Sequence, residues 1–326
     1  MRVVITGGAG FLGKLLAAKI LQRGVLSDSA GQPQPVSELV LVDMAPATGE
    51  SWLADPRVSQ VVGDIADRAV LATALTPDTR SIFHLAAVVS GQAEADFDIG
   101  MRVNVDATRT LLELTRTLPT PPKFVFTSSI AVFGGALPAV LPDDQILTPQ
   151  GSYGAQKAMG ELLVSDMSRR GLIDGRSLRL PTVTVRPGKP NKAASSFASG
   201  IIREPLAGVD AICPTAPETK MWVQSPPRVI ENILMGHEAS ASALSNTRSV
   251  SVPGITVSVR EMMESLRRVA GDSVAARVTW QLDPVIDRLV SSWPQAFSAE
   301  RGKSLGMTAD ANFDEIVRAY IGSLSA

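Results

Sequence analysis

The 326-residue sequence is poor in cysteine and histidine, with Cys213 as its one cysteine and His84 and His237 as its histidines. A single cysteine excludes an internal disulfide and fits a reducing compartment. Neither histidine stands in a cluster of cysteines and carboxylates at metal-ligand spacing. The sequence therefore predicts no metal site.

The chain also lacks an excess of one charge and a long apolar run. Its formal net charge is -1, which gives no basic footprint for nucleic acid and no polybasic membrane patch. No run reaches the ~18 apolar residues that span a bilayer. The apolar N-terminus is interrupted from Gly7 and has no cleavage motif of a signal peptide. We therefore expect a cytoplasmic protein of about two domains that binds neither nucleic acid nor membrane.

The first thirteen residues combine an apolar run with closely spaced glycines. Residues 2–6 are apolar and β-branched, as in a buried parallel strand, and residues 11–22 have an amphipathic helical pattern. Glycines without Cβ let a diphosphate approach, and the N–H groups of the first helical turn then face it. This pattern predicts a dinucleotide site, with a plain glycine-rich loop as the alternative. The predicted contacts are Gly7, Gly10, Phe11, Leu12 and Gly13.

Further strand ends carry residues suited to the rest of a dinucleotide. Asp43 closes the apolar run 38–43, where a carboxylate accepts hydrogen bonds from the adenosine ribose and opposes the 2′-phosphate of NADP. No arginine follows it, so NAD is predicted; an Asp that only caps the next turn is the alternative. Asp64 and Ile65 are candidates for contacts with adenine. At Leu85, Ala86 and Ala87, small residues let the backbone pass close to the cofactor. The last candidate is Asn104, on the helix 97–118.

Strands and helices alternate throughout the first half. Residues 58–62, 81–87 and 123–129 read as strands and residues 97–118 as a helix. Such alternation predicts an α/β fold with a Rossmann-type, doubly wound parallel sheet. We expect this domain over residues 1–180 and a smaller C-terminal substrate-binding region over 181–326, partly interleaved with the first.

Tyr153 and Lys157 lie four residues apart at the start of a predicted helix, so both side chains share one face. A nearby cation lowers the pKa of a tyrosine and makes it a usable general base. Ser129 at the end of the strand 123–129 would hold the same substrate oxygen, with Ser128 as a stand-in. Lys157 would also hold the nicotinamide ribose. His84, flanked by apolar residues, is predicted to be packed rather than catalytic.

Together these residues resemble a known family. The motifs TGGAGFLG, HLAA, FTSSIAVFG and YGAQK, with Asp43 and Asp64, are similar to the extended short-chain dehydrogenases/reductases, the NAD-dependent epimerase/dehydratase family. The resemblance implies catalysis by Ser129, Tyr153 and Lys157, and nicotinamide contacts at Pro181 and Val183. It also implies a homodimer or homotetramer that packs the helices 97–118 and 153–170.

In the second half, the motifs LRLPT (178–182), FASGIIREPL (197–206), MWVQSP (221–226) and SWP (292–294) resemble a subgroup of this family. Members of that subgroup oxidise the four-carbon sugar acid D-erythronate with NAD. Its carboxylate needs cationic donors, and residues 186–192 are rich in them, although a solvated basic loop is the alternative. The predicted substrate contacts are Ser129, Tyr153, Arg186, Lys189, Asn191 and Lys192. A nucleotide-sugar epimerase or dehydratase that retains its NAD is the alternative function, and a non-catalytic NAD sensor is a weaker one because Tyr153 and Lys157 are both present.

Overall fold

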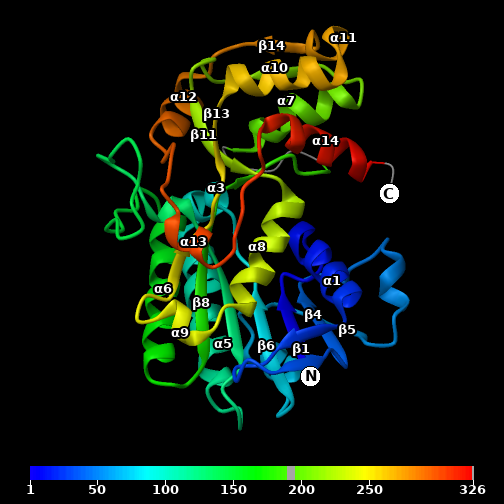
Figure 1. The fold of residues 1–326 in the computed structure, drawn as a ribbon, viewed down its shortest axis with the longest axis vertical. Helices are drawn as coiled ribbons and strands as arrows, with labels where there is room; N and C mark the ends of the chain where they lie inside the picture. Colours follow the sequence, from blue (N-terminus) through cyan, green and yellow to red (C-terminus); the bar gives the residue numbers. More distant parts are fainter. Residues whose placement is uncertain (189–194, 325–326) are drawn as a thin grey trace.

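The computed structural model describes residues 1–188 and 195–324, and a seven-stranded parallel sheet lies at its centre (Figure 1). The strand order is β12-β8-β7-β6-β1-β4-β5. All neighbours are parallel, which confirms the predicted α/β fold. The strands are β1 (Arg2–Thr6), β4 (Glu38–Asp43), β5 (Val58–Val62), β6 (Thr79–His84), β7 (Lys123–Ser129), β8 (Asp174–Leu180) and β12 (Ser249–Ser251).

Helices cover both faces of this sheet because its strands are apolar on both sides. Val3 and Ile5 of β1 join a core with Leu16 and Ile20 of α1, whereas Val4 between them faces the opposite core. Helices α1 (Phe11–Arg23) and α8 (Pro226–Glu238) pack on the first side. Helices α2 (Arg68–Ala74), α5 (Ala107–Thr115) and α6 (Ser152–Arg169) pack on the other.

The predicted helix 97–118 is present but is not uniform. It comprises α4 (Phe97–Gly100), a π-helical turn η2 (Met101–Asp106) and α5, and it ends at Thr115. The side chain of Asn104 in the π-helical turn is buried. Single-turn π-helical insertions are frequent at functional sites, and this one brings Asn104 to the site described below.

The apolar segment 177–185 contributes to two different sheets. β8 ends at Leu180, and β9 (Thr182–Val183) belongs to a three-stranded sheet in the order β13-β11-β9. Pro181 lies at the division because proline cannot donate a ladder hydrogen bond. The other members of this sheet are β11 (Lys220–Gln224) and β13 (Ile255–Ser258).

A second core packs around this smaller sheet. It contains apolar side chains such as Ile201, Met262 and Ile316. A capping box of Ser258 and Glu261 begins α10. The surrounding elements are α7 (Ser196–Leu206), β10 (Ala211–Cys213), α10 (Val259–Ala270), α11 (Asp272–Ala275), β14 (Val278–Trp280), α12 (Pro284–Ser291) and α14 (Phe313–Ser323). Helix α13 (Glu300–Ser304) instead lies against β12 of the large sheet.

Short elements complete the chain. A small antiparallel hairpin of β2 (Val25–Ser27) and β3 (Pro33–Pro35) lies between α1 and β4 in the chain. The rest are η1 (Ser51–Ala54), α3 (Ser90–Ala95), η3 (Ile130–Val132) and α9 (Ala241–Leu244). No helix in the described part of the chain is long and apolar enough to cross a membrane.

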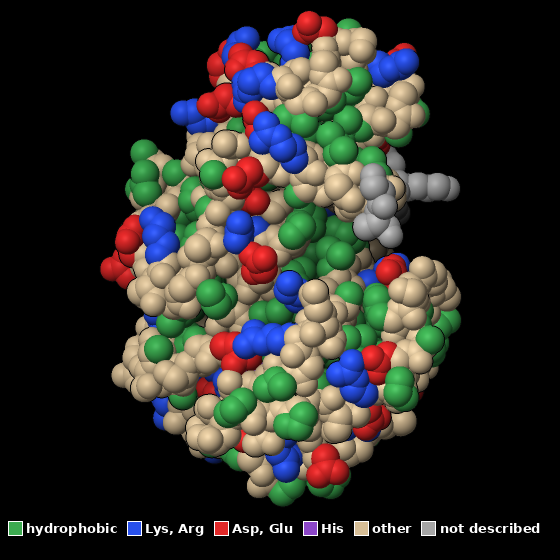
Figure 2. All heavy atoms as spheres, turned by 45° about the vertical axis from the view of Figure 1, so that its right-hand side comes forward, with side chains coloured by type: hydrophobic (Ala, Val, Ile, Leu, Met, Phe, Trp, Pro, Cys, Tyr) green, Lys and Arg blue, Asp and Glu red, His purple; other side chains and the backbone are tan. Residues whose placement is uncertain are grey.

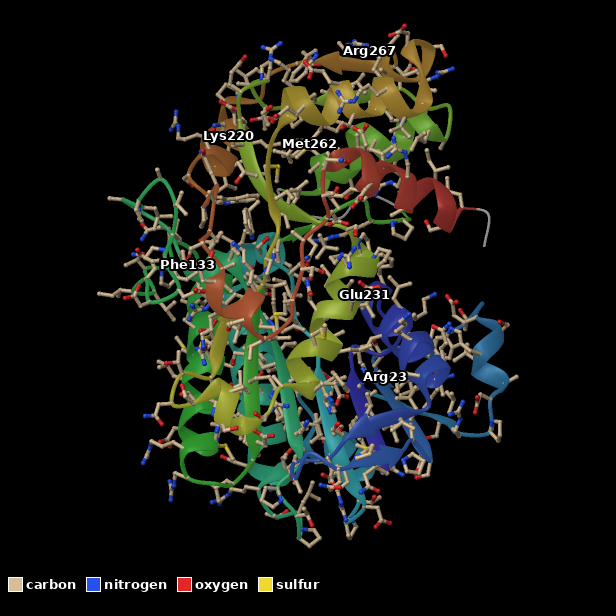
Figure 3. All side chains as sticks on the ribbon, in the orientation of Figure 1. Arg23, Phe133, Lys220, Glu231, Met262 and Arg267 are labelled. Carbon is tan, nitrogen blue, oxygen red and sulfur yellow. The ribbon has the colours of Figure 1, made fainter. Side chains whose placement is uncertain are left out.

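The sheet and the smaller part are joined by α8 and by a shared apolar cluster. Trp222 of β11 packs against Phe297 with ring centroids 5.4 Å apart, and both contact the segment after β7. Trp222 is thus a core residue. Figure 3 shows the side chains that fill the interior of both parts. Between the two parts the surface is hollowed, and hydrophobic side chains lie at the floor of this hollow (Figure 2).

Candidate functional site

The glycine-rich turn between β1 and α1 is too tightly packed for side chains. A Cβ on Gly13 would lie 2.0 Å from the Gly7 carbonyl oxygen, and one on Gly7 would lie 2.8 Å from the Ala86 nitrogen. Gly7 also has a φ of +71°, which glycine adopts without strain. The N-cap of α1 is Gly10, so no side chain caps the start of this helix. The N–H groups of Phe11, Leu12 and Gly13 are therefore oriented for an anion, and this turn fits the diphosphate of a dinucleotide.

The two predicted acidic contacts lie at the ends of neighbouring strands β4 and β5. Asp43 accepts hydrogen bonds from the backbone nitrogens of Ala9 (3.0 Å) and Met44 (2.8 Å). It therefore supports the glycine-rich turn and also caps its own turn. Asp64 is paired with Arg102 at 2.5 Å, and this hydrogen bond holds the pKa of the Asp64 carboxyl below its usual value. The Ile65 side chain packs in the core, so only its backbone groups can contact a ligand.

The segment after β6 passes directly beside the glycine-rich turn. The Leu85 nitrogen donates to the Thr6 carbonyl at 3.1 Å, and Ala86 and Ala87 follow. Asn104 fixes the next residue, because its side chain accepts from the Val88 nitrogen at 2.8 Å and donates to the Val88 carbonyl at 3.1 Å. Asn104 also donates to Gln156 of α6 at 2.7 Å. Its side chain thus links this segment to the helix that carries Tyr153.

His84 has the packed position that the sequence predicted. Its Nδ1 lies 2.6 Å from the Thr6 hydroxyl and its Nε2 lies 2.8 Å from the Thr108 hydroxyl. Thr108 donates to the Asn104 carbonyl, so His84 Nε2 carries the proton and Nδ1 accepts from Thr6. Burial lowers the pKa of His84 to about 3, and the ring is neutral.

Tyr153, Lys157 and Ser129 gather at the carboxyl ends of β7 and β8. Lys157 Nζ donates to the Thr127 carbonyl at 2.9 Å and lies 5.6 Å from the centroid of the Tyr153 ring. The Ser129 Oγ accepts from the Ala131 nitrogen at 3.1 Å. That bond uses a lone pair of Ser129 and leaves its proton for a substrate oxygen.

The structure corrects the predicted electrostatics of the tyrosine. The expectation was that Lys157 lowers the pKa of Tyr153, but burial raises this pKa to about 12 and the opposing charge is that of Arg186. Burial also lowers the pKa of Lys157 to about 7, against the attraction of Glu161. Tyr153 is therefore a neutral phenol at neutral pH, because desolvation disfavours the phenolate more than the charge of Arg186 favours it.

The two serines at the end of β7 have different surroundings. Ser128 is buried, and its hydroxyl donates to Glu161 at 2.5 Å. Ser129 is partly exposed and lies one residue nearer the strand end. Its side chain points to the opposite face of the strand from that of Ser128. This geometry favours Ser129 over Ser128 as the residue that meets a substrate.

Of the predicted substrate contacts, Arg186 is held firmly beside the tyrosine. Its Nε donates to the Val183 carbonyl at 3.0 Å, and its backbone carbonyl accepts from Arg203 at 2.8 Å. Within residues 1–188 and 195–324 no hydrogen bond is formed by its two terminal nitrogens. The guanidinium is therefore placed to receive an anion near Tyr153. Lys189, Asn191 and Lys192 lie outside the described residues.

The predicted nicotinamide contacts Pro181 and Val183 flank the step from β8 to β9. Both side chains are buried, and Val183 belongs to the core under α8. Only their backbone groups can reach a ligand. Thr182 between them is partly exposed.

Three residues near the site escaped the sequence reasoning. Glu94 of α3 accepts from the Ser152 nitrogen at 2.8 Å and so caps α6, whose own N-cap is the glycine Gly151. Glu161 and Arg179 form a buried ion pair at 2.7 Å. The spacing of Lys157 and Glu161, one helical turn apart, was a local signal for Glu161, whereas Glu94 and Arg179 meet α6 only through the fold. Across the described ranges no three His, Cys, Asp or Glu side chains are grouped to hold a metal.

The chain is similar to known proteins over nearly its whole length. Residues 3–222 match the NAD dependent epimerase/dehydratase family. The chain is 57% identical to a D-erythronate dehydrogenase of Cupriavidus necator over 98% of both chains, and 40% identical to one of Haemophilus influenzae over 98% of this chain and 99% of that protein. A crystal structure described as a nucleoside-diphosphate-sugar epimerase from Agrobacterium tumefaciens superposes with a TM-score of 0.92 at 38% identity, covering 99% of this chain and 94% of the other.

Proposed function

Because the chain belongs to the NAD dependent epimerase/dehydratase family, we propose that it oxidises D-erythronate to 2-dehydro-D-erythronate with NAD as hydride acceptor. Family membership confirms NAD as the cofactor predicted from Asp43 and the glycine-rich turn. The observation that carries the substrate is the 57% identity to a D-erythronate dehydrogenase over 98% of both chains. An identity of 40% to a second protein of that name supports it.

The residues of the site divide the work of this reaction. Bound NAD supplies the carbon that accepts the hydride. Tyr153 takes the proton of the substrate hydroxyl, and Ser129 donates a hydrogen bond to the same oxygen. Lys157, anchored on the Thr127 carbonyl, contributes positive charge beside the phenol. A protonated Lys157 lowers the cost of forming phenolate at the moment of proton transfer.

Arg186 binds the substrate carboxylate in this proposal. Its guanidinium is anchored through Nε, so the terminal nitrogens can form a charge-assisted pair with a carboxylate. The guanidinium also acts electrostatically on Tyr153, which places the carboxylate-binding group beside the general base. In the proposed reaction the hydroxyl that is oxidised lies on the carbon next to the carboxylate, so the general base and the carboxylate-binding group must lie close together. Lys189, Asn191 and Lys192 remain predicted contacts.

The test is the growth of NADH absorbance when the purified protein and NAD⁺ are mixed separately with D-erythronate, L-threonate and UDP-glucose. Net NADH formation with D-erythronate is the expected result. Arg186→Lys should raise KM for D-erythronate by about tenfold or more, because a lysine cannot form the bidentate pair. No NADH with either acid would contradict the proposal.

A nucleotide-sugar epimerase is the second candidate, since the Agrobacterium tumefaciens structure carries that description. Such an enzyme returns the hydride to its substrate and releases no NADH. Epimer formation from UDP-glucose without net NADH would therefore favour this candidate and reject the dehydrogenase.

We further propose a cytoplasmic homodimer that packs the surfaces of α4 and α6 from two copies. Three large apolar side chains are exposed on these helices, namely Phe97, Met159 and Leu162, the last with 67% of its surface accessible. Burying them would remove apolar area from water. Leu162→Glu should convert the dimer to a monomer in light scattering, whereas Leu289→Glu, at an exposed leucine of α12, should not.

A further inference from the structure

A buried ion pair lies one helical turn beyond Lys157. Glu161 of α6 is 2% exposed and Arg179 of β8 is 7% exposed. Arg179 donates from Nε to Oε1 of Glu161 at 3.0 Å and from Nη2 to Oε2 at 2.7 Å. The Ser128 hydroxyl donates to Oε1 at 2.5 Å. Both carboxylate oxygens of Glu161 are thus engaged by neighbouring strands.

These contacts join the three elements that build the active site. Ser128 and Arg179 are directly opposite each other in the β7–β8 ladder, one residue before Ser129 and Leu180. Lys157 holds the preceding residue of β7 through the Thr127 carbonyl. Helix α6 is therefore attached to β7 at two successive residues and to β8 at one. Any shift of α6 along the sheet would break charge-assisted bonds that are sheltered from water.

The pair also sets the charge around Lys157. Glu161 is four residues from Lys157 on the same helix face, and its charge favours the protonated amine. The other titratable or charged groups around Lys157 are Tyr153 of α6, neutral His84 of β6 and Arg179 of β8, and Arg186 faces Tyr153. Thr127 of β7 contributes a carbonyl. Glu161 is the negative charge in this group.

Stability alone is a weak reason for such a pair. Removing two charges from water costs several kcal/mol per ion, and well-packed apolar residues often stabilise a core as well. The Arg179 guanidinium also stacks on Phe133, 4.9 Å from the ring centroid, in the segment that follows Ser129. The pair therefore contacts both elements that carry the catalytic residues, helix α6 and the Ser129 end of β7.

We propose that Glu161 and Arg179 are positioning residues of the active site, in which Arg179 locks α6 onto the Ser129 end of β7 and β8 and Glu161 keeps the Lys157 ammonium charged. The inference rests on the proposed function, because it assigns roles in the same oxidation. Neither residue touches substrate, and both act through Tyr153, Lys157 and Ser129.

The test compares Glu161→Gln with Asp174→Asn. Asp174 is also a buried carboxylate on β8, paired with Arg176 and Arg248, but it lies at the opposite end of the strand. Both variants should lose thermal stability. Only Glu161→Gln should move the alkaline limb of kcat against pH to lower pH, by about one unit, because Lys157 then loses its proton more readily. Equal pH profiles in wild type and Glu161→Gln would overturn the role of Glu161.

A second measurement does not depend on the substrate. NMR titration of protein carrying 13C at lysine Cε, with Lys157→Gln to assign the resonance, should show a lower pKa for Lys157 in Glu161→Gln and an unchanged one in Asp174→Asn. If the wild-type protein is inactive on D-erythronate but Glu161→Gln still lowers the pKa of Lys157, the proposed substrate is rejected and the inference stands. If the wild-type protein oxidises D-erythronate but Glu161→Gln leaves the pKa of Lys157 unchanged, the proposed function stands and the inference is rejected.

Arg179→Lys tests the positioning part separately and is expected to fold because a cation remains beside Glu161. It should lower kcat about tenfold with KM for NAD⁺ little changed and the pH profile retained, since the charge of Glu161 persists while the bidentate lock is lost. An unaltered kcat would overturn the role of Arg179. A variant that loses thermal stability but keeps the wild-type kcat would also overturn the role of Arg179.

Discussion

At the scale of single residues, the site is defined by what surrounds the Tyr153 phenol. Burial raises its pKa to about 12, so proton transfer needs the charges of Arg186 and Lys157 and a substrate oxygen in place. A tyrosine with a raised pKa keeps its proton at neutral pH unless nearby charges favour the phenolate.

Replacing Tyr153 by Phe should lower turnover by roughly a hundredfold or more, because the general base is removed while the ring remains. NADH binding should stay nearly intact. Tyr320→Phe is the matched control, since Tyr320 lies in the core of the smaller part, on α14. Steady-state rates and calorimetric NADH binding measure both effects. A Tyr153→Phe enzyme with the turnover of Tyr320→Phe would contradict the mechanism.

The two serines of β7 should separate catalysis from stability. Ser129→Ala should lower kcat with little change in the free energy of unfolding, because Ser129 is partly exposed and its Oγ accepts one backbone bond. Ser128→Ala should cost about 1–3 kcal/mol of unfolding free energy, since it removes a donor from a buried carboxylate. Urea titrations and kcat measurements on both variants test this division. The reverse pattern would make Ser128 the catalytic serine.

At the scale of elements, the turn between β1 and α1 is packed so closely that it requires glycines, which have no Cβ. Gly13→Ala would place a Cβ 2.0 Å from the Gly7 carbonyl oxygen, so α1 must move away from β1. We expect a loss of about 1–3 kcal/mol and weakened NAD⁺ binding. Gly322→Ala is the control, because Gly322 lies in α14 with open space around it and alanine favours helix there. Calorimetric titration with NAD⁺ and thermal unfolding measure both. Undiminished NAD⁺ binding in Gly13→Ala would contradict this packing argument.

Much of the element pattern could be predicted from the sequence, because it depends on local periodicity. The strand ends at Asp43, the helix starting at Ser152 and the break at Pro181 all follow from residue type and spacing. The π-helical turn at Met101–Asp106 could not be predicted in this way, because the spacing of apolar residues does not distinguish it from the α-helix around it. The pairing of Arg186 with Tyr153 and of Arg179 with Glu161 joins residues from different elements. Local sequence carries no signal for such partners.

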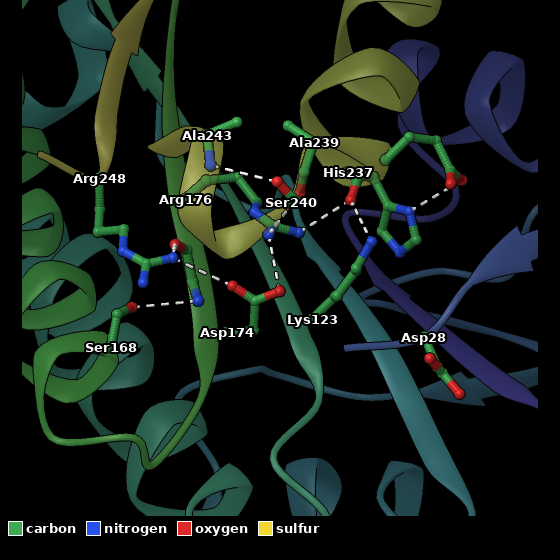
Figure 4. A network of polar contacts seen from close by, with 12 residues as sticks. Asp28, Lys123, Ser168, Asp174, Arg176, His237, Ala239, Ser240, Ala243 and Arg248 are labelled. Carbon is green, nitrogen blue, oxygen red and sulfur yellow. Dashed lines mark hydrogen bonds and ion pairs between the residues drawn. The ribbon is translucent and has the colours of Figure 1, made fainter. Parts of the chain in front are cut away.

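At the scale of the whole molecule, a second polar network ties α8 to the opposite end of the sheet (Figure 4). Lys123 of β7 and Arg176 of β8 donate to the His237 carbonyl at 2.9 and 3.0 Å, which places two cations on the C-terminal end of α8. The His237 ring lies 2.8 Å from the Ser81 hydroxyl and 3.2 Å from Glu238. This network holds α8, the connection between the two parts, in its place on the sheet.

The buried histidines should make the fold sensitive to acid. Burial lowers the pKa of His237 from 6.5 to about 4 and that of His84 from 6.5 to about 3. Each native ring is neutral, so the unfolded chain binds more protons than the native protein below about pH 6.5. Stability is then fully present above pH 6.5 and is lost as the pH falls toward 4, by about 1.4 kcal/mol per histidine per pH unit.

The measurement is the free energy of unfolding from urea titrations at a series of pH values across this window. His237→Asn keeps a polar group near Glu238 but cannot titrate, so it should be less stable than wild type at neutral pH and should lose stability about half as steeply on acidification. Exposed acid–base pairs such as Arg109 with Glu113 are screened by solvent and add little to the slope. A slope that is identical in wild type and His237→Asn would mean that His237 is already protonated in the native protein.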